Sequence, residues 1–184
     1  MTQDGDARSD LWGLEWDFLA VDSAGHVAVL SSAGYGPIPE LVLAAREVVG
    51  RADDAIEALP TFTQAVRDNP EREGNFSDWY SLSERGLFAY DWNLWHGPYK
   101  RIASPAEPLN ISSLPEQVQA AARLLQIPYL FAGATELHLA HELTDIGDRS
   151  AERESSERDE ARPASESGRP WWLRIPRAVR GLRS

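Results

Sequence analysis

Cysteine is absent from the 184-residue chain. Its absence excludes disulfide bonds, thiolate-bound zinc, iron–sulfur clusters and a thiol nucleophile. No stretch approaches the roughly 18 apolar residues that a membrane-spanning helix requires. The first residues, Met1 to Asp6, are polar and acidic, whereas a secretory signal has a basic start followed by an apolar run. Together these absences predict a cytoplasmic protein.

Charge is distributed unevenly along the chain. Residues 1–147 carry 22 acidic and 9 basic side chains, a net charge of -13. An acidic body repels phosphate backbones, so we expect it not to bind nucleic acid. It can attract a basic protein partner and speed the encounter between them. A simpler interpretation is that the acidic surface keeps the protein soluble.

A β-hairpin is the first element that the sequence indicates. Two β-prone runs, residues 16–22 and 26–32, are separated by a short connection that contains Gly25. Glycine accepts the positive φ that such a connection requires. Alternate residues of the second run are apolar on both faces, which predicts a strand covered on both sides.

Two principal helices are expected in the body of the chain. The first runs from Glu40 to about Leu59, where apolar residues recur at helical spacing. Gly50 weakens this helix by roughly 1 kcal/mol relative to alanine, so we expect a bend or break there. The second helix begins at Ser113, which forms a capping box with Glu116 three residues later.

Shorter elements complete a single α+β domain over residues 1–147, with a mainly antiparallel sheet opened by the hairpin. Strands are predicted at residues 87–92, 99–103 and 127–132. Residues 135–143 fit a strand by the spacing of Leu137 and Leu139 and a helix by that of Leu139 and Leu143, and the strand is the preferred prediction. A helix capped by Ser77 is predicted at residues 77–84, a helical turn at residues 63–68 and a linker at residues 104–113.

The C-terminal part of the chain has a different composition. Residues 148–168 are dense in charged residues and serine, and they cannot bury enough apolar surface to offset their ordering entropy. We therefore expect a disordered charged linker there. Residues 169–184 contain five arginines and no acid, so the net charge of this tail is positive, opposite to that of the body.

Tryptophan and arginine are interleaved in this basic tail. Such a pattern suits an anionic membrane surface or a nucleic acid. Docking on the acidic body and an extension without function are the alternatives. The candidate binding residues are Trp171, Trp172, Arg174, Arg177 and Arg180.

No catalytic motif is recognisable. His138 and His141 precede Glu142, but this order is not the H-E-x-x-H zinc motif. Gly34 and Gly36 are followed by prolines, which favours a structural turn over a phosphate cradle. We therefore expect no catalytic residue, cofactor or metal site, although carboxylate acid–base chemistry stays open because acids are abundant.

Aromatic residues are better candidates for partner binding, because they dominate both cores and interface hot spots. Trp95 lies in an expected loop, where it either anchors a partner or folds back over the core. The candidate partner-binding residues are Asp78, Trp79, Asp91, Trp92, Trp95 and His96.

The segment from Phe18 to Pro39 resembles the start of small bacterial proteins that share the hairpin pattern F-A-x-D-x-x-G-x-x-A-x-F-x-x-A-G-x-G-P-x-P. Some of these proteins resemble immunity proteins, which neutralise polymorphic toxins. Residues 86–91 and 97–99 have a similar character. The resemblance covers about a third of the domain and implies no catalytic residue.

These observations predict a non-enzymatic binding protein of the immunity or antitoxin type, whose acidic face covers a basic site on a toxin. An enzyme that uses carboxylates is the second hypothesis. A membrane-surface adaptor acting through the basic tail is the third. The sequence does not indicate an oligomeric state.

Overall fold

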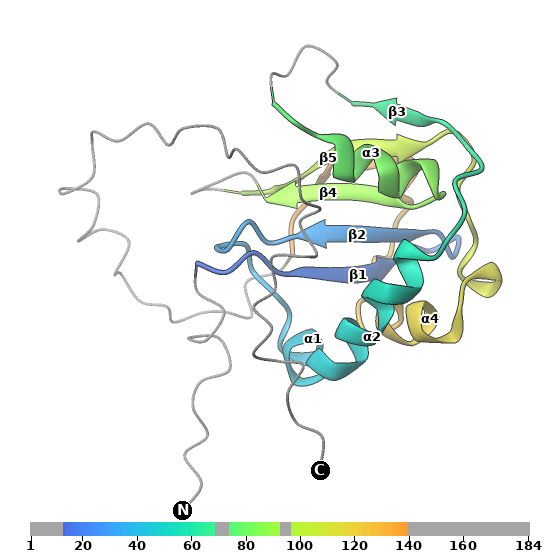
Figure 1. Cartoon of the computed structure of the whole chain (residues 1–184). Coiled ribbons are helices and arrows are strands. Elements are labelled where there is room, and N and C mark those ends of the chain that lie inside the picture. The colour runs from blue at the N-terminus through green and yellow to red at the C-terminus, as the bar shows by residue number, and fades with distance from the viewer. Residues whose placement is uncertain (1–12, 69–73, 93–96, 140–184) are drawn as a thin grey trace, which may run out of the picture. The chain divides into compact units, whose positions relative to one another are not determined.

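The computed structural model describes residues 13–68, 74–92 and 97–139 (Figure 1). All of them belong to one unit, Met1–Glu142. The linker predicted at residues 148–168 and the basic tail predicted at residues 169–184 lie outside the described residues. In the described ranges, no helix combines the length and the apolar composition that crossing a bilayer requires.

One six-stranded sheet forms the centre of the fold, in the order β1-β2-β4-β5-β3, with β6 also paired to β5. Its strands are β1 (Asp17–Val21), β2 (Val27–Ser31), β3 (Ala65–Arg67), β4 (Phe88–Trp92), β5 (Tyr99–Pro105) and β6 (Glu136–Leu137). Among these strands only β2 and β4 pair in parallel. The predicted α+β class, with a mainly antiparallel sheet opened by a hairpin, is confirmed.

Four α-helices accompany the sheet in the described residues: α1 (Glu40–Ala44), α2 (Arg46–Glu57), α3 (Ser77–Glu84) and α4 (Glu116–Ala122). The first predicted helix is present, but it breaks at Ala45 and not at Gly50. Ala45 has φ of -107° and ψ of 32°, outside the helical region, and its N–H bonds back to Val42 at 3.1 Å. Gly50 stays helical within α2.

Two sequence predictions about secondary structure are wrong. Residues 63–68 hold strand β3 instead of a helical turn, because Val66 pairs with Ser104 at the end of β5. Residues 127–132 form no strand. The Ile127 N–H bonds to the Val21 carbonyl at 2.8 Å, and the chain then turns through the short 3₁₀ helix η3 (Phe131–Gly133).

The predicted helix caps and linker also need correction. Neither Ser77 nor Ser113 caps its helix, because the N-cap positions are Phe76 and Pro115 and neither makes a side-chain cap bond. The predicted linker at residues 104–113 begins with the last two residues of β5 and ends in the 3₁₀ helix η2 (Ile111–Ser113).

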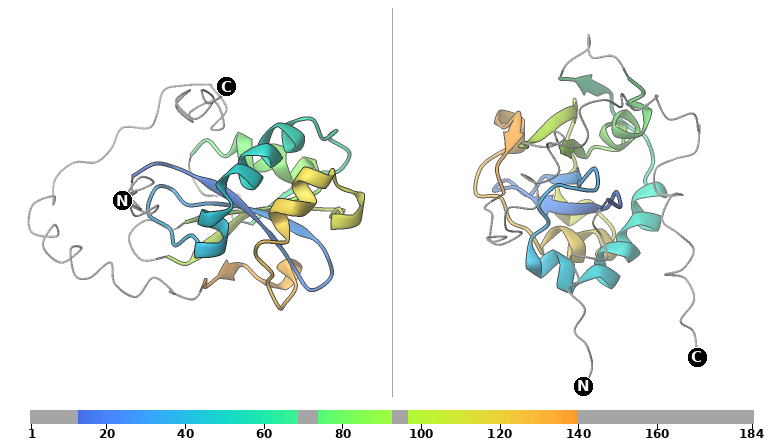
Figure 2. Two further views of the ribbon diagram at one scale, coloured as in Figure 1. Left: turned by 90° about the horizontal axis from the view of Figure 1, so that it is seen from below. Right: turned by 90° about the vertical axis from the view of Figure 1, so that its left-hand side faces the viewer.

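The sheet is covered differently on its two faces. Helices α2, α3 and α4 lie on one face, and the segment with η3 and β6 lies on the other (Figure 2). Phe18, Leu30 and Tyr90 form one in-register row. The Tyr90 ring lies 5.8 Å from the Phe131 ring, so this row faces η3. The next row therefore faces the helices, because side chains alternate along each strand. It consists of Leu19, Val29 and Ala89.

The glycine-rich turn after β2 packs directly against aromatic side chains. A Cβ at Gly36 would meet the Tyr99 hydroxyl, the Ser32 carbonyl and the Trp92 ring at 2.5–3.0 Å. We expect Gly36→Ala to lower the free energy of unfolding by about 1–3 kcal/mol through overpacking. Urea denaturation followed by tryptophan fluorescence measures the change.

The matched control is Gly50→Ala in α2, where an added Cβ meets no atom within 4 Å. That substitution should raise stability by up to about 1 kcal/mol, because alanine has the higher helix propensity. Equal effects of the two substitutions would contradict the close packing at Gly36.

Candidate functional site

Acidic side chains gather at one end of the sheet. Asp17 of β1 pairs in register with Ser31 of β2, and Ser31 pairs in register with Asp91 of β4. In-register partners point to the same face, so the two aspartates flank Ser31. Asp17 also shares a face with Leu19, two residues further along the strand. The row therefore lies on the face that the helices cover.

Asp17 is the most buried member of this group. It is only 9 % exposed, and its Oδ1 has no hydrogen-bond partner among the described residues. Burial, and next the charge of Glu15, hold the pKa of the Asp17 carboxyl well above its ordinary value. Asp53 and Asp91 raise the pKa further, while a hydrogen bond from Ser31 opposes the shift.

Helix α2 contributes a second carboxyl to the same region. Burial, followed by the charges of Asp54 and Glu57, raises the pKa of Asp53 to about 7. The Ser31 hydroxyl donates to Glu15 Oε1 at 3.0 Å, which places the Glu15 carboxylate beside the row. We call Glu15, Asp17, Asp53 and Asp91 the acidic cluster.

Three members of the acidic cluster lack an ion pair among the described residues. Ion pairs in the described part of the chain include none made by Glu15, Asp17 or Asp53. Within residues 13–68, 74–92 and 97–139, no three carboxylate or imidazole side chains lie close enough together to bind one metal ion. The arrangement can hold protons on its carboxyls and attract a cationic group.

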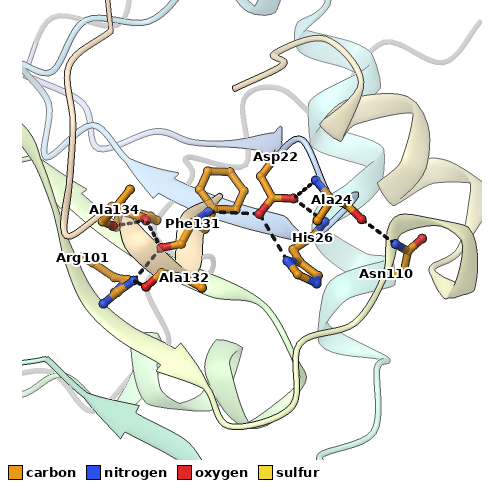
Figure 3. Close-up of polar contacts among 9 residues, drawn as sticks. Asp22, Ala24, His26, Arg101, Asn110, Phe131, Ala132 and Ala134 are labelled. Carbon is orange, nitrogen blue, oxygen red and sulfur yellow. Dashed lines mark hydrogen bonds and ion pairs between the residues drawn. The ribbon is translucent and has the colours of Figure 1, made fainter. Parts of the chain in front are cut away.

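A second polar network fixes the turn that crosses the opposite face (Figure 3). Asp22 follows β1, and its carboxylate is fully buried. Its Oδ1 accepts the N–H groups of Ala24 at 2.9 Å and His26 at 2.8 Å, which closes the hairpin turn. Its Oδ2 accepts the Phe131 N–H at 3.0 Å and lies 3.2 Å from His26 Nδ1.

Arg101 and Tyr90 hold the same turn from its carbonyl side. Arg101 Nη1 donates to the Phe131 carbonyl at 2.6 Å, and the Tyr90 hydroxyl donates to the Ala134 carbonyl at 2.6 Å. Arg101 also pairs with both carboxylate oxygens of Asp68, at 2.6 and 2.9 Å. These groups satisfy one another within the chain, so we assign this network to holding η3 in place.

The structure separates the partner-binding residues that the sequence suggested. Asp91 belongs to the acidic cluster. Trp92, its neighbour in β4, is partly buried against the core, with its ring 5.0 Å from the Tyr99 ring. Asp78 and Trp79 lie half-buried on α3, and no described contact joins them to the acidic cluster.

Several candidates lie outside the described residues. They are Trp95, His96, His141, Glu142, and the tail residues Trp171, Trp172, Arg174, Arg177 and Arg180. His138 is described and exposed, with its Nε2 lying 3.8 Å from a carboxylate oxygen of Glu136.

Sequence reasoning missed Glu15, Asp17 and Asp53. One signal was available for Asp17, because it stands inside the β-prone run 16–22, whose other residues up to Val21 are apolar and favour burial. Its proximity to Asp91 had no local signal. That proximity depends on the parallel pairing of β2 with β4, which joins residues about 60 positions apart.

Comparison of the chain with protein-family models, with curated proteins and with solved structures gave no match in any of the three. The acidic cluster is therefore interpreted from its own geometry.

Proposed function

We propose that this protein is a non-enzymatic binding protein that takes a basic protein partner on its acidic surface. The partner would be a toxin domain, and the protein would act in the cytoplasm as an immunity or antitoxin-type protein. The observation that carries this proposal is the acidic cluster, in which Oδ1 of the buried Asp17 has no hydrogen-bond partner among the described residues and Asp17 makes no ion pair there.

Electrostatic and energetic arguments support this interpretation. A buried carboxylate without a partner is costly, and a cation supplied from outside removes that cost. The cluster lies on a body with a net charge of -13 over residues 1–147, which would steer a basic protein toward it. Burial and neighbouring acids raise the pKa of Asp17 and Asp53, which favours their protonated form in the unbound protein.

A carboxylate-dependent enzyme is the second candidate. It is favoured by one observation, the pKa of about 7 at Asp53, which suits a general acid or base at neutral pH. An enzyme would be stabilised by a small-molecule substrate with no protein present. Thermal-shift screening of metabolites therefore separates the two candidates.

The binding proposal predicts salt-sensitive capture of a defined partner. Full-length protein immobilised as bait should retain a basic protein from the native host at about 0.1 M salt. It should release that protein at about 1 M salt, where the Debye length falls to about 3 Å. The double variant Asp17→Asn/Asp91→Asn should lose most of the captured partner.

The control for this capture is Glu107→Gln. Glu107 is exposed and follows Pro105, at the end of β5 opposite the acidic cluster. Retention by this variant, combined with loss by the cluster variant, would support the cluster as the binding surface. A partner that stays bound at 1 M salt, or that binds the cluster variant equally well, would contradict the proposal.

A further inference from the structure

We propose that the free edge of β3 binds an extended, basic segment of a protein partner, which adds one more strand to the sheet. Strand β3 ends the path β1-β2-β4-β5-β3, and Figure 1 shows it as the outermost strand, beyond β5. This inference goes beyond the proposed function, because the contact is made through the backbone of β3 and does not use the acidic cluster.

The hydrogen bonds between β3 and β5 show which backbone groups of β3 point outward. The Gln64 carbonyl accepts an N–H from the residue that follows β5 at 2.9 Å, and the Asp68 N–H donates to a carbonyl of β5 at 3.2 Å. Backbone groups of successive residues face opposite sides of an antiparallel strand, so those of Val66 also face β5. The N–H and C=O groups of Ala65 and Arg67 therefore face away from β5.

These outward groups are free and accessible. Within the described part of the chain, no hydrogen bond reaches the backbone of Ala65 or Arg67. Unpaired N–H and C=O groups on an edge strand are a template for a further strand. The side chains do not close the edge, because Arg67 is exposed and Val66 is 50 % exposed. Phe62, just before the strand, is 48 % exposed and adds a second apolar side chain.

The charged side chains of β3 do not guard this edge. Natural proteins protect edge strands with charges that project from them. Here the Arg67 guanidinium lies over the Tyr80 ring of α3, 4.5 Å from its centroid. The Asp68 carboxylate, directly after the strand, pairs with Arg101 of β5 at 2.6 and 2.9 Å. Both charges are engaged within the chain, which leaves Val66 and the free backbone groups for a partner.

The charge of the body favours a basic segment over a second copy of the chain. Residues 1–147 carry a net charge of -13, so two copies repel each other, whereas a basic segment is attracted. Glu84 is exposed and lies beside the start of the edge, since its carbonyl accepts the Thr63 N–H at 3.2 Å. The neighbouring Arg85 is turned along α3, where its Nη1 donates to a helix carbonyl at 2.9 Å.

The register of β3 also specifies the side chain that the added strand places beside Val66. Because Val66 bonds to β5, it forms a non-hydrogen-bonded pair with the residue opposite it in an antiparallel added strand. Side chains of such pairs lie close together, so an apolar residue is favoured there. The two flanking residues of the added strand then bond to Ala65 and Arg67, with two backbone hydrogen bonds at each.

Full-length protein and a short synthetic peptide test this inference. The peptide alternates valine and threonine and has a lysine at each end. Its binding should slow amide hydrogen exchange at Ala65 and Arg67 about tenfold, while the Val66 and Asp68 amides, which face β5, stay slow with or without the peptide. The same peptide N-methylated at its threonines lacks the donors that flank the valine beside Val66. It should bind about tenfold more weakly.

Variants of β3 and of the peptide provide the controls. Ala65→Pro removes an outward donor and no bond to β5, a position where an edge strand accepts proline, and it should weaken the peptide about fivefold. Ala65→Val keeps the N–H and should change the affinity less than twofold. A peptide with glutamates in place of the lysines should bind several-fold more weakly than the lysine peptide. The Asp17→Asn/Asp91→Asn variant should bind the lysine peptide within twofold of the native protein.

Equal binding of the N-methylated peptide, equal binding of the glutamate peptide, or unchanged exchange at Ala65 and Arg67 would each overturn the inference. Slow exchange at these two amides without peptide, increasing with protein concentration, would also overturn it, because that result indicates pairing of β3 between two copies. The peptide measurements concern β3 alone. Loss of a captured partner from the Asp17→Asn/Asp91→Asn variant therefore tests the proposed function separately.

Discussion

Replacing Asp22 by alanine is expected to lower the free energy of unfolding by about 4 kcal/mol. The substitution leaves three backbone N–H groups, those of Ala24, His26 and Phe131, without their acceptor. Of these donors the Phe131 N–H is buried and the other two are partly buried, and a buried donor that loses its partner costs about 1–3 kcal/mol. Small domains are stable by only about 5–15 kcal/mol, so the loss would be a large fraction of the total.

The mechanism of this loss can be tested separately from its size. Hydrogen exchange at the Phe131 amide should accelerate, because Asp22 Oδ2 is its acceptor. Asp22→Asn should have an intermediate effect, since it keeps one oxygen acceptor and replaces the other by a donor. The control is Ser23→Ala at an exposed position of the same turn. A loss below about 1 kcal/mol for Asp22→Ala would contradict the role of this network.

Replacing Asp53 by asparagine is expected to raise stability at pH 8 by about 3 kcal/mol, with no gain near pH 3.5. The pKa of Asp53 is about 7 in the folded protein, against an ordinary value of 3.8. Ionisation therefore costs folding free energy, and the cost accumulates as pH rises from about 4 to 7. The value of about 3 kcal/mol is smaller than the full pKa difference would give, because solvent reaches this half-buried side chain.

Urea denaturation at a series of pH values checks this expectation. The native protein should lose stability between pH 4 and pH 7, and Asp53→Asn should flatten that slope. Glu107→Gln removes the same charge at the other end of the sheet and should leave the slope unchanged. Parallel pH profiles for the native protein and Asp53→Asn would show that ionisation of Asp53 does not lower the free energy of unfolding.

Local signals in the sequence explain which elements could be predicted. The hairpin follows from two β-prone runs around Gly25, which has φ of 83°. The break in the first helix could not be located, because propensity points to Gly50 while the chain bends at Ala45. Residues 127–132 have strand composition, but the side chains of Asp22 and Arg101 hold their end in a turn.

Long-range pairing explains why the candidate site could be predicted only in part. Asp91 was predicted as a partner-binding residue within an aromatic segment, and its place in the acidic cluster had no local signal. Asp17 and Asp53 depend on burial for their pKa values, and burial is set by strands and helices distant in sequence. Short elements such as β3, with three residues, have too little pattern to be recognised.

The parallel junction between β2 and β4 also has a consequence for the order in which the molecule assembles. It divides the sheet into two antiparallel halves, β1 with β2 on one side and β4 with β5, β3 and β6 on the other. Within each half, the strands that pair lie closer together in the sequence. Pairing β2 with β4 closes a loop of more than 50 residues, which costs more conformational entropy. Asp17 and Ser31 come from one half and Asp91 from the other. The acidic cluster therefore exists only while the two halves are joined, and any partner that recognises it distinguishes the completed fold from its precursors.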